Sequence, residues 1–332
     1  MRLSCLRHAM LVATAFAAFA TPAAAQAPLT KISVMEPIHS LFYSPLYAAI
    51  NKGFFKDEGI EVDLSVAQGS DKATAALLAG SAQVVLVGPE TAIYIQNGQS
   101  PLKTKIVSGL TSTDGSFLVG RKKDEKFDWA SLKGKQIMSW RKGSAPGLFM
   151  EAALRKNGLD PDKDVTLITN TAIPARMGAF IGGQADYGTF FEPDVSRMEA
   201  DGKGVSLINI GQAVGPIDYT VFVATDDLIA KNPKLVQGFT NAIARSLNWI
   251  EKVDPKEAAA VLAPSFPGIP ADTIASSVAR HRDAGVWKKT PLVEAPAIEA
   301  LQNLLITSGI LKPEQKVTYE SVVATGFAKA VR

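Results

Sequence analysis

The sequence predicts an α/β protein of two lobes, each built on a doubly wound sheet, with a two-segment hinge between them. Strand-like and helix-like segments alternate from residue 31 onward, as they do along mainly parallel sheets. The alternation starts again near residue 116, and a later segment returns to the first lobe. The length of 332 residues also exceeds what one hydrophobic core usually serves.

The first lobe is expected to contain four strands, at residues 31–35, 61–66, 83–87 and 105–110. The third is an almost unbroken apolar run, which is typical of a strand buried on both faces. Helices are expected between these strands, at 45–52, 71–78 and 90–96, and a glycine follows each of them. Ser44 is expected to cap the first helix, and Pro45 suits its first position.

The second lobe is expected to begin at a crossing strand over 117–121. Further strands are expected at 136–140, 165–168, 186–190 and 205–210, and helices at 144–156 and 172–181. Residues 219–224 are expected to form the return crossing, so the first lobe comprises 28–115 and 220–332, and the second 116–219. Two crossings form a hinge that can close the lobes over a ligand.

The last third of the chain is expected to be helical. An apolar stripe with helical spacing indicates a packing face, and its residues are Leu235, Phe239, Ile243, Leu247 and Ile250. Three shorter helices are expected at 256–262, 271–282 and 295–306.

Residues 1–25 have the pattern of a secretory signal peptide. Arg2 and Arg7 precede an apolar run that is too short to span a membrane, and small residues follow it. This pattern predicts export to the periplasm and a soluble mature chain. Cys5 is the one cysteine and lies in the leader, so the mature chain is expected to have no disulfide, thiolate zinc site or cysteine nucleophile.

The charge and the motifs exclude several classes of function. Loss of the two leader arginines lowers the formal charge from +3 to +1, which is too little for nucleic-acid binding. The mature chain keeps only His39 and His281, in distant segments, and it has no G-x-S-x-G or H-E-x-x-H motif. We therefore expect a binding protein rather than an enzyme, without cofactor or metal, and a monomer.

A ligand is expected where the strands of both sheets end, because helix N-termini meet there. Five loops satisfy this condition, at 36–44, 88–91, 111–116, 140–147 and 189–194. They contain the candidate ligand-binding residues His39, Phe42, Tyr43, Ser44, Pro89, Glu90, Thr91, Thr113, Trp140, Arg141, Gly143, Ser144, Phe190 and Glu192.

Each candidate also has a purely structural interpretation. Arg141 and Ser144 favour an anion at a helix start, but Ser144 can simply cap that helix while Arg141 faces water. Phe42 and Tyr43 can stack on a planar ligand or pack inside the lobe. Glu192 can accept hydrogen bonds from a ligand amine or support Arg141.

Several of these segments resemble one protein family. Residues 44–62 read SPLYAAINKGFFKDEGIEV, and shorter matches are LKGK at 132–135, GQAD at 183–186, Glu192-Pro193 and Asn232-Pro233. These motifs closely resemble periplasmic binding proteins for nitrate, sulfonate, taurine and thiamine-pyrimidine precursors. The resemblance covers roughly residues 30–255. It implies a type II periplasmic-binding-protein fold and, as partner, the permease and ATPase of an ABC importer.

The resemblance leaves more than one ligand open. Phe191 stands where taurine and sulfonate members often have tryptophan, so sulfonate specificity does not transfer directly. One hypothesis is a small organic anion, such as a sulfonate, a nitrate-like ion or an aromatic carboxylate, held at the helix starts near Ser44 and Ser144. The other is a planar, pyrimidine-like heterocycle stacked on Tyr43 and Trp140. A ligand-sensing partner of a membrane receptor would use the same fold. The related fungal pyrimidine synthases carry a cysteine-rich motif that the mature chain lacks.

Overall fold

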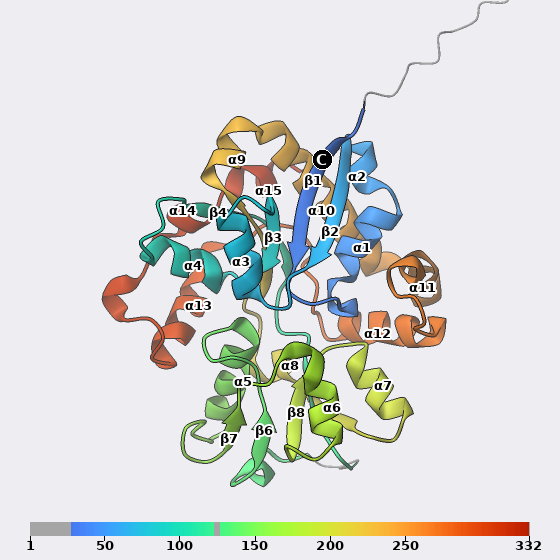
Figure 1. Cartoon of the computed structure of the whole chain (residues 1–332), viewed down its shortest axis with the longest axis vertical. Helices are drawn as coiled ribbons and strands as arrows, with labels where there is room; N and C mark the ends of the chain where they lie inside the picture. The colour runs from blue at the N-terminus through green and yellow to red at the C-terminus, as the bar shows by residue number, and fades with distance from the viewer. Residues whose placement is uncertain (1–27, 123–126, 332) are drawn as a thin grey trace, which may run out of the picture.

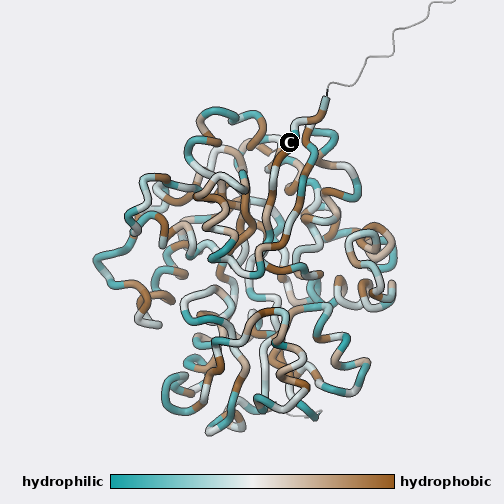
Figure 2. The backbone as a smooth tube through the Cα atoms, viewed as in Figure 1, coloured by the Kyte–Doolittle hydropathy of each residue, from teal (hydrophilic) through white to brown (hydrophobic). Residues whose placement is uncertain are grey.

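The computed structural model describes residues 28–122 and 127–331, which form two lobes, one above the other in Figure 1. The expected signal peptide lies outside the described residues. Each lobe contains one five-stranded sheet, and apolar segments concentrate along the inner strands (Figure 2). The structure therefore confirms the expected two-sheet α/β architecture. Within the described residues, none of the helices combines the length and apolar character needed to cross a membrane.

The upper sheet has the strand order β2-β1-β3-β10-β4. Its strands are β1 (Thr30–Glu36), β2 (Ile60–Val66), β3 (Val84–Val87), β4 (Thr104–Thr111) and β10 (Thr220–Thr225). Strands β1, β2 and β3 are parallel, and Val34 of β1 lies opposite Leu64 of β2 on one side and Val84 of β3 on the other. Strand β10 lies antiparallel between β3 and β4, and its residues 220–224 are buried because the sheet is covered on both faces.

The lower sheet repeats this arrangement with the order β7-β6-β8-β5-β9. Its strands are β5 (Phe117–Gly120), β6 (Gln136–Met138), β7 (Thr166–Ile168), β8 (Tyr187–Phe190) and β9 (Val205–Asn209). Here β5 is the antiparallel strand between two neighbours. In both sheets, the strand that the chain enters directly from the other lobe, β10 above and β5 below, therefore occupies the second place from one edge.

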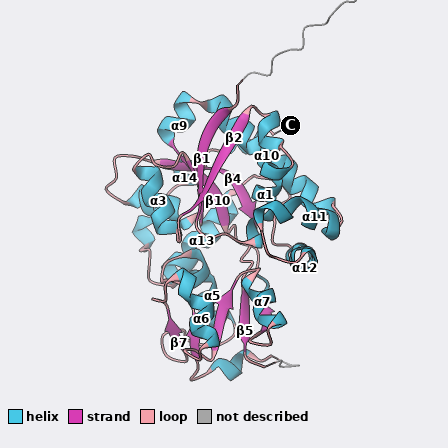
Figure 3. Ribbon diagram, turned by 45° about the vertical axis from the view of Figure 1, so that its right-hand side comes forward, coloured by secondary structure: helices cyan, strands magenta, loops and turns pink. Residues whose placement is uncertain are grey.

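Helices cover both sheets, as the turned view in Figure 3 shows. The upper lobe contains α1 (Ser44–Asn51), α2 (Phe54–Asp57), α3 (Ser70–Leu78), α4 (Glu90–Asn97), α9 (Asp226–Lys231), α10 (Pro233–Lys252), α11 (Pro255–Leu262), α12 (Ala271–Asp283), α13 (Ala295–Thr307), α14 (Tyr319–Val322) and α15 (Thr325–Lys329). The lower lobe contains α5 (Ala145–Lys156), α6 (Arg176–Ile181), α7 (Asp194–Ala200) and α8 (Ile210–Val214). The apolar stripe of α10 packs against α1, β4 and β2, as its spacing predicts.

Two local expectations were wrong. Ser44 does not cap α1: it is the first residue of that helix, and its hydroxyl donates to the Leu41 carbonyl at 2.6 Å. A 3-10 turn at Leu41–Tyr43 precedes α1 and moves the cap position to Tyr43. The helix expected over 172–181 is also divided, into a 3-10 turn at Ile173–Ala175 and then α6, which starts at Arg176.

The chain passes between the sheets twice, through residues 112–116 and 215–219. Thr113 joins the two passages, because its hydroxyl donates to the Gly215 carbonyl at 2.9 Å. Gly115 lies directly against the ring of Phe42, where an added Cβ would come within 2.3 Å of ring carbon. Phe42 is fully buried and therefore packs on the hinge rather than toward open space.

Candidate functional site

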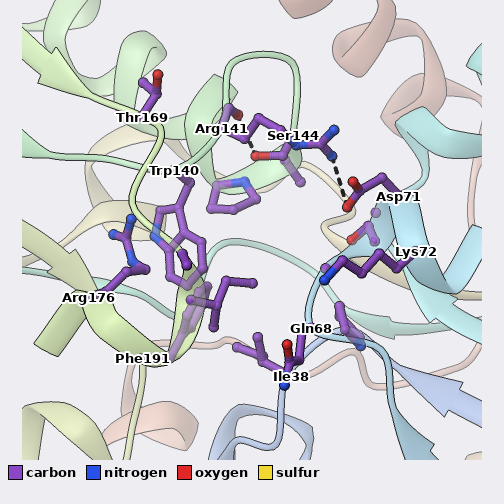
Figure 4. A pocket seen from close by; sticks show the side chains of 18 of the residues that line it. Ile38, Gln68, Asp71, Lys72, Trp140, Arg141, Ser144, Thr169, Arg176 and Phe191 are labelled. Atoms are coloured by element: carbon purple, nitrogen blue, oxygen red, sulfur yellow. Dashed lines mark hydrogen bonds and ion pairs between the residues drawn. The ribbon is translucent and has the colours of Figure 1, made fainter.

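A hollow of about 280 Å³ lies between the lobes, at the ends of the strands. Its walls come from the loops after β1, β2 and β3 of the upper lobe and after β6, β7 and β8 of the lower lobe, together with the return passage at Tyr219 and Thr220. Figure 4 shows this hollow, which we call the first compartment. A second compartment of about 370 Å³ adjoins it and shares Ile38, Trp140 and Arg176, among others, as wall.

The charged side chains of the first compartment are mostly cationic. Three of the four charged residues that line it are cations, namely Lys72, Arg141 and Arg176, and the fourth is the carboxylate Asp71. Arg141 of the lower lobe and Asp71 of the upper lobe lie 3.4 Å apart, and both are about half exposed (Figure 4). An exposed pair of this kind contributes little stability, so it bridges the mouth without neutralising the deeper wall.

Arg176 is the most deeply buried of these cations, at 3 % exposure. Its guanidinium carbon lies 4.0 Å from the centre of the Trp140 ring. It donates to the main-chain carbonyls of Ser139, of Met138 at 3.2 Å and of Thr189 at 3.0 Å, all at the ends of β6 and β8. Burial lowers the pKa of Arg176 to about 10, so the group stays charged at neutral pH.

No carboxylate within the described residues forms an ion pair with Arg176. A buried charge is normally paired, because its desolvation costs several kcal/mol. Carbonyl dipoles, an aromatic face and the charge of Asp194, which favours the charged form of Arg176 without forming an ion pair with it, stabilise this one only in part. The wall therefore carries a positive potential that an anion in the compartment would complement.

Aromatic rings form the other part of the wall. Trp140 and Phe191 lie with ring centres 5.4 Å apart, and Tyr43 and Tyr219 complete the surface. Tyr43 is 3 % exposed and lines the first compartment, where burial raises the pKa of its hydroxyl and keeps it protonated. The compartment can therefore accept a flat ring beside an anionic group.

The candidate residues from the sequence divide into two groups. Half of them line a compartment. The first compartment is lined by Tyr43, Trp140, Arg141 and Ser144, and the second by His39, Phe190 and Glu192. The others line neither compartment, namely Phe42, Ser44, Pro89, Glu90, Thr91, Thr113 and Gly143. Thr91 donates to the Gly88 carbonyl at 2.7 Å, and the Gly143 carbonyl accepts from the Tyr94 hydroxyl at 2.7 Å.

The start of α5, where an anion was expected, already holds a carboxyl group of the protein. The Ala145 N–H donates to the Glu90 carboxyl group at 3.0 Å. This hydrogen bond joins the two lobes, because Glu90 belongs to the upper lobe and Ala145 to the lower. Burial raises the pKa of Glu90 to about 7. The Ser144 side chain does not cap α5, contrary to its structural interpretation, because its hydroxyl donates to the Arg141 carbonyl at 2.6 Å.

Glu192 does not support Arg141. Its buried carboxylate forms an ion pair with Arg280 of α12 at 2.9 Å and accepts from the Ser196 N–H at 3.0 Å. Its main-chain carbonyl also accepts from the Ser40 hydroxyl, at 2.6 Å. Since Ser40 and Arg280 belong to the upper lobe and Glu192 to the lower, this residue ties the lobes together beside the second compartment.

His39 lies at the second compartment between two acceptors. Its Nδ1 is 2.8 Å from the Glu36 carboxylate, and its Nε2 is 2.7 Å from the Ser265 carbonyl. Hydrogen bonding to Glu36 raises the pKa of His39, because both ring nitrogens then donate as imidazolium.

We expect this contact to make stability depend on pH. A histidine whose pKa is raised by folding stabilises the protein fully below about 6.5, its unfolded value, and loses that effect as the pH rises through the folded value. The melting temperature of wild type should therefore exceed that of His39→Gln at pH 6, and the difference should shrink toward pH 8.5. A difference that stays constant over this range would contradict the prediction.

The structure also brings in residues that the sequence analysis missed. They are Ile38, Gln68 to Lys72, Thr169 to Pro174, and Arg176. Most of them follow β2 and β7, the edge strands of the two sheets. The strand-end rule, applied to those two strands as well, would have found both loops. Among the described residues, no group of three or more potential ligands could hold a metal ion.

Comparison with known proteins places the chain in a family. The family model described as NMT1/THI5 like matches residues 42–258. The chain belongs to the NMT1/THI5-like family. The putative binding protein YtlA of Bacillus subtilis (strain 168) is 36 % identical over 323 residues, 96 % of each chain.

More distant relatives of this NMT1/THI5-like chain differ in what they do. The alkanesulfonate-binding protein SsuA from Xanthomonas axonopodis pv. citri, solved with MOPS, has a TM-score of 0.71 at 20 % identity and covers 89 % of this chain and 99 % of its own. The 4-amino-5-hydroxymethyl-2-methylpyrimidine phosphate synthase of Candida albicans (strain WO-1) is 22 % identical over 235 residues, 65 % of this chain and 66 % of the synthase. The fold of the solute-binding proteins is thus confirmed.

Proposed function

We propose that the chain is an exported solute-binding protein that captures a small organic anion between its lobes. The ligand is a sulfonate, a nitrate-like ion or an aromatic carboxylate. The protein then delivers it, from the periplasm, to the permease and ATPase of an ABC importer. The observation that carries the proposal is the buried Arg176 guanidinium, which has no ion-pair partner among the described residues and lines the same hollow as Arg141 and Lys72.

The ligand-contacting residues in this proposal are those with access to the first compartment. Arg141, Lys72 and the Tyr43 hydroxyl donate to the anion, and Arg176 adds its charge from behind. Trp140 and Phe191 contact the organic part. YtlA and SsuA, named as binding proteins, support a binding role rather than catalysis. His39 and His281 do not line this compartment, which gives a nucleophile no histidine base there.

A pyrimidine-like heterocycle is the second candidate. It is favoured by the four rings of Tyr43, Trp140, Phe191 and Tyr219 around the first compartment, and by the partial similarity to the fungal pyrimidine synthase. A neutral ring would leave Arg176 without an ion-pair partner, so this candidate ranks below the anion.

A ligand panel tests the proposal. The chain from Gln26 is expressed and refolded to remove any bound ligand, and its melting temperature is measured with sulfonates, nitrate, aromatic carboxylates and pyrimidines. A ligand at 100 times its Kd stabilises the native state by about 2.7 kcal/mol, which raises the melting temperature measurably. A saturable shift with anions supports the proposal. A shift with neutral pyrimidines alone would contradict it.

The role of Trp140 can be separated from charge with a matched pair of ligands. Trp140→Ala should weaken benzenesulfonate by about 1–3 kcal/mol more than methanesulfonate, since only the former has a ring to stack. Isothermal titration measures both affinities. Trp249→Ala, outside both compartments, serves as the control and should leave both affinities unchanged. Equal losses for the two ligands in Trp140→Ala would show that stacking plays no part.

A further inference from the structure

Gln68 has an unusual backbone for its residue type. Its φ is 60°, and within 28–122 and 127–331 it is the one residue other than glycine with a positive φ. Left-handed backbone is costly for a side chain with a Cβ, and such residues gather at functional sites. Glycine would adopt this conformation without that cost. The retained glutamine side chain therefore needs an explanation.

The position of Gln68 between the two compartments explains why a glutamine is found there. It lies in the loop between β2 and α3 and lines both the first and the second compartment. In Figure 4 it lies on the wall opposite Trp140 and Phe191. Two hydrogen bonds hold this loop against the end of β1: the Ala67 N–H donates to the Glu36 carbonyl and the Gly69 N–H to the Pro37 carbonyl, each at 2.8 Å. Its backbone is thus held, while the Gln68 side chain remains exposed.

The two compartments differ in charge. The first is cationic, through Lys72, Arg141 and Arg176 against Asp71. The second has charged residues of both signs in its wall, with Arg176 and Arg197 as cations and Glu192 and Asp194 as carboxylates. With about 370 Å³, the second compartment has room for the far end of a ligand whose anionic group lies in the first. That far end meets carboxylates as well as cations, unlike the anionic end, which suits a neutral polar group better than a second anion.

On the basis of the proposed function, we propose that Gln68 is a ligand-binding residue whose side-chain amide hydrogen-bonds a neutral polar group on the ligand, opposite its anionic end. A glutamine amide offers one carbonyl acceptor and two N–H donors. Its best complement is a group that also both donates and accepts, such as a primary carboxamide. The ligand class is then an organic anion extended by an amide-like group, long enough to reach from the first compartment to the boundary with the second.

Two probes and three variants test the inference. The probes are benzenesulfonate and 4-carbamoylbenzenesulfonate, titrated calorimetrically. Wild type should bind the carbamoyl compound about tenfold more tightly. Gln68→Gly should bind both probes alike, since it keeps the backbone and removes the amide. Its melting temperature should equal or exceed that of wild type, because glycine relieves the left-handed backbone.

The other two variants are controls. Gln68→Asn keeps an amide on a shorter side chain and tolerates left-handed backbone, so it should retain part of the tenfold preference. Gln99→Gly removes an exposed glutamine from a loop outside both compartments, so this variant should keep the full tenfold preference for the carbamoyl probe.

The outcomes separate this inference from the proposed function. If wild type and Gln68→Gly prefer the carbamoyl probe equally, or if wild type binds benzenesulfonate but shows no preference, the role of Gln68 is overturned and anion binding stands. If wild type binds neither probe nor any other anion of the panel, the proposed function fails and the inference with it.

Discussion

Replacing Arg280 by alanine is expected to lower the free energy of unfolding by about 3 kcal/mol. The substitution leaves the Glu192 carboxylate, which is 0 % exposed, without the cation at 2.9 Å that offsets its burial. It also removes the pair between Arg280 and Glu199 at 3.2 Å and the packing of the guanidinium over Phe117. Since Arg280 itself is about a third exposed, the effect falls at the lower end for a buried pair. Urea unfolding measures it.

A second substitution and a change of pH test the cause. Arg280→Ala combined with Glu192→Gln should be less destabilised than the sum of the single variants, because the buried charge is then gone. Burial raises the pKa of Glu192, so the carboxyl becomes neutral as the pH falls through that value. The destabilisation by Arg280→Ala should therefore shrink in acid. A loss below 1 kcal/mol at pH 7, or one that is the same at all pH values, would contradict the role of this pair.

Replacing Arg176 by methionine is expected to weaken the binding of an organic anion about a hundredfold. Two unit charges about 5 Å apart attract each other by roughly 3 kcal/mol at an effective dielectric constant of about 20. Methionine keeps much of the side-chain volume beside Trp140 but removes the charge. It also leaves the carbonyls of Met138, Ser139 and Thr189 without their donor, so the melting temperature should fall as well.

Arg121 provides the matched control for this loss. It belongs to the same lobe, stacks on Phe180 at 4.6 Å and donates to the carbonyls of Phe180 and Ala185 at 2.6 and 2.7 Å. It lines neither compartment. Arg121 is exposed, so Arg121→Met should lower the melting temperature less than Arg176→Met, and it should leave the Kd for the anion unchanged. Equal Kd values for wild type and Arg176→Met would remove the main support for an anionic ligand.

The elements of this fold could be predicted because their signals are local. The apolar run of β3 and the apolar stripe of α10 can each be recognised within a short stretch of sequence. The run is buried, and so is the stripe apart from Leu235, which is half-buried. The predictions that were wrong concern positions where a contact outside the predicted element decides the local structure. Ser44 looked like a helix cap, but the preceding 3-10 turn gives its hydroxyl another acceptor.

The site was only partly predictable from the same patterns. Trp140 and Arg141 follow a central strand and lie at the first compartment, as the strand-end rule suggests. Phe42 and Glu90 obey the same rule, yet they line no compartment. The ring of Phe42 fills the space beside Gly115, and the Glu90 carboxyl meets the start of α5 from the other lobe. Neither neighbour is near in sequence.

The sequence by itself determined the alternation of strands and helices, the two lobes and the family, since hydrophobic periodicity and short motifs encode these locally. Only the tertiary structure decided which charges meet. Glu192 pairs with Arg280 and Arg141 with Asp71 across the two lobes, whereas Arg176 contacts carbonyl groups and the Trp140 ring and forms no ion pair within the described residues. The strength of an electrostatic interaction depends on distance and burial, which are fixed only when segments far apart in the sequence pack together.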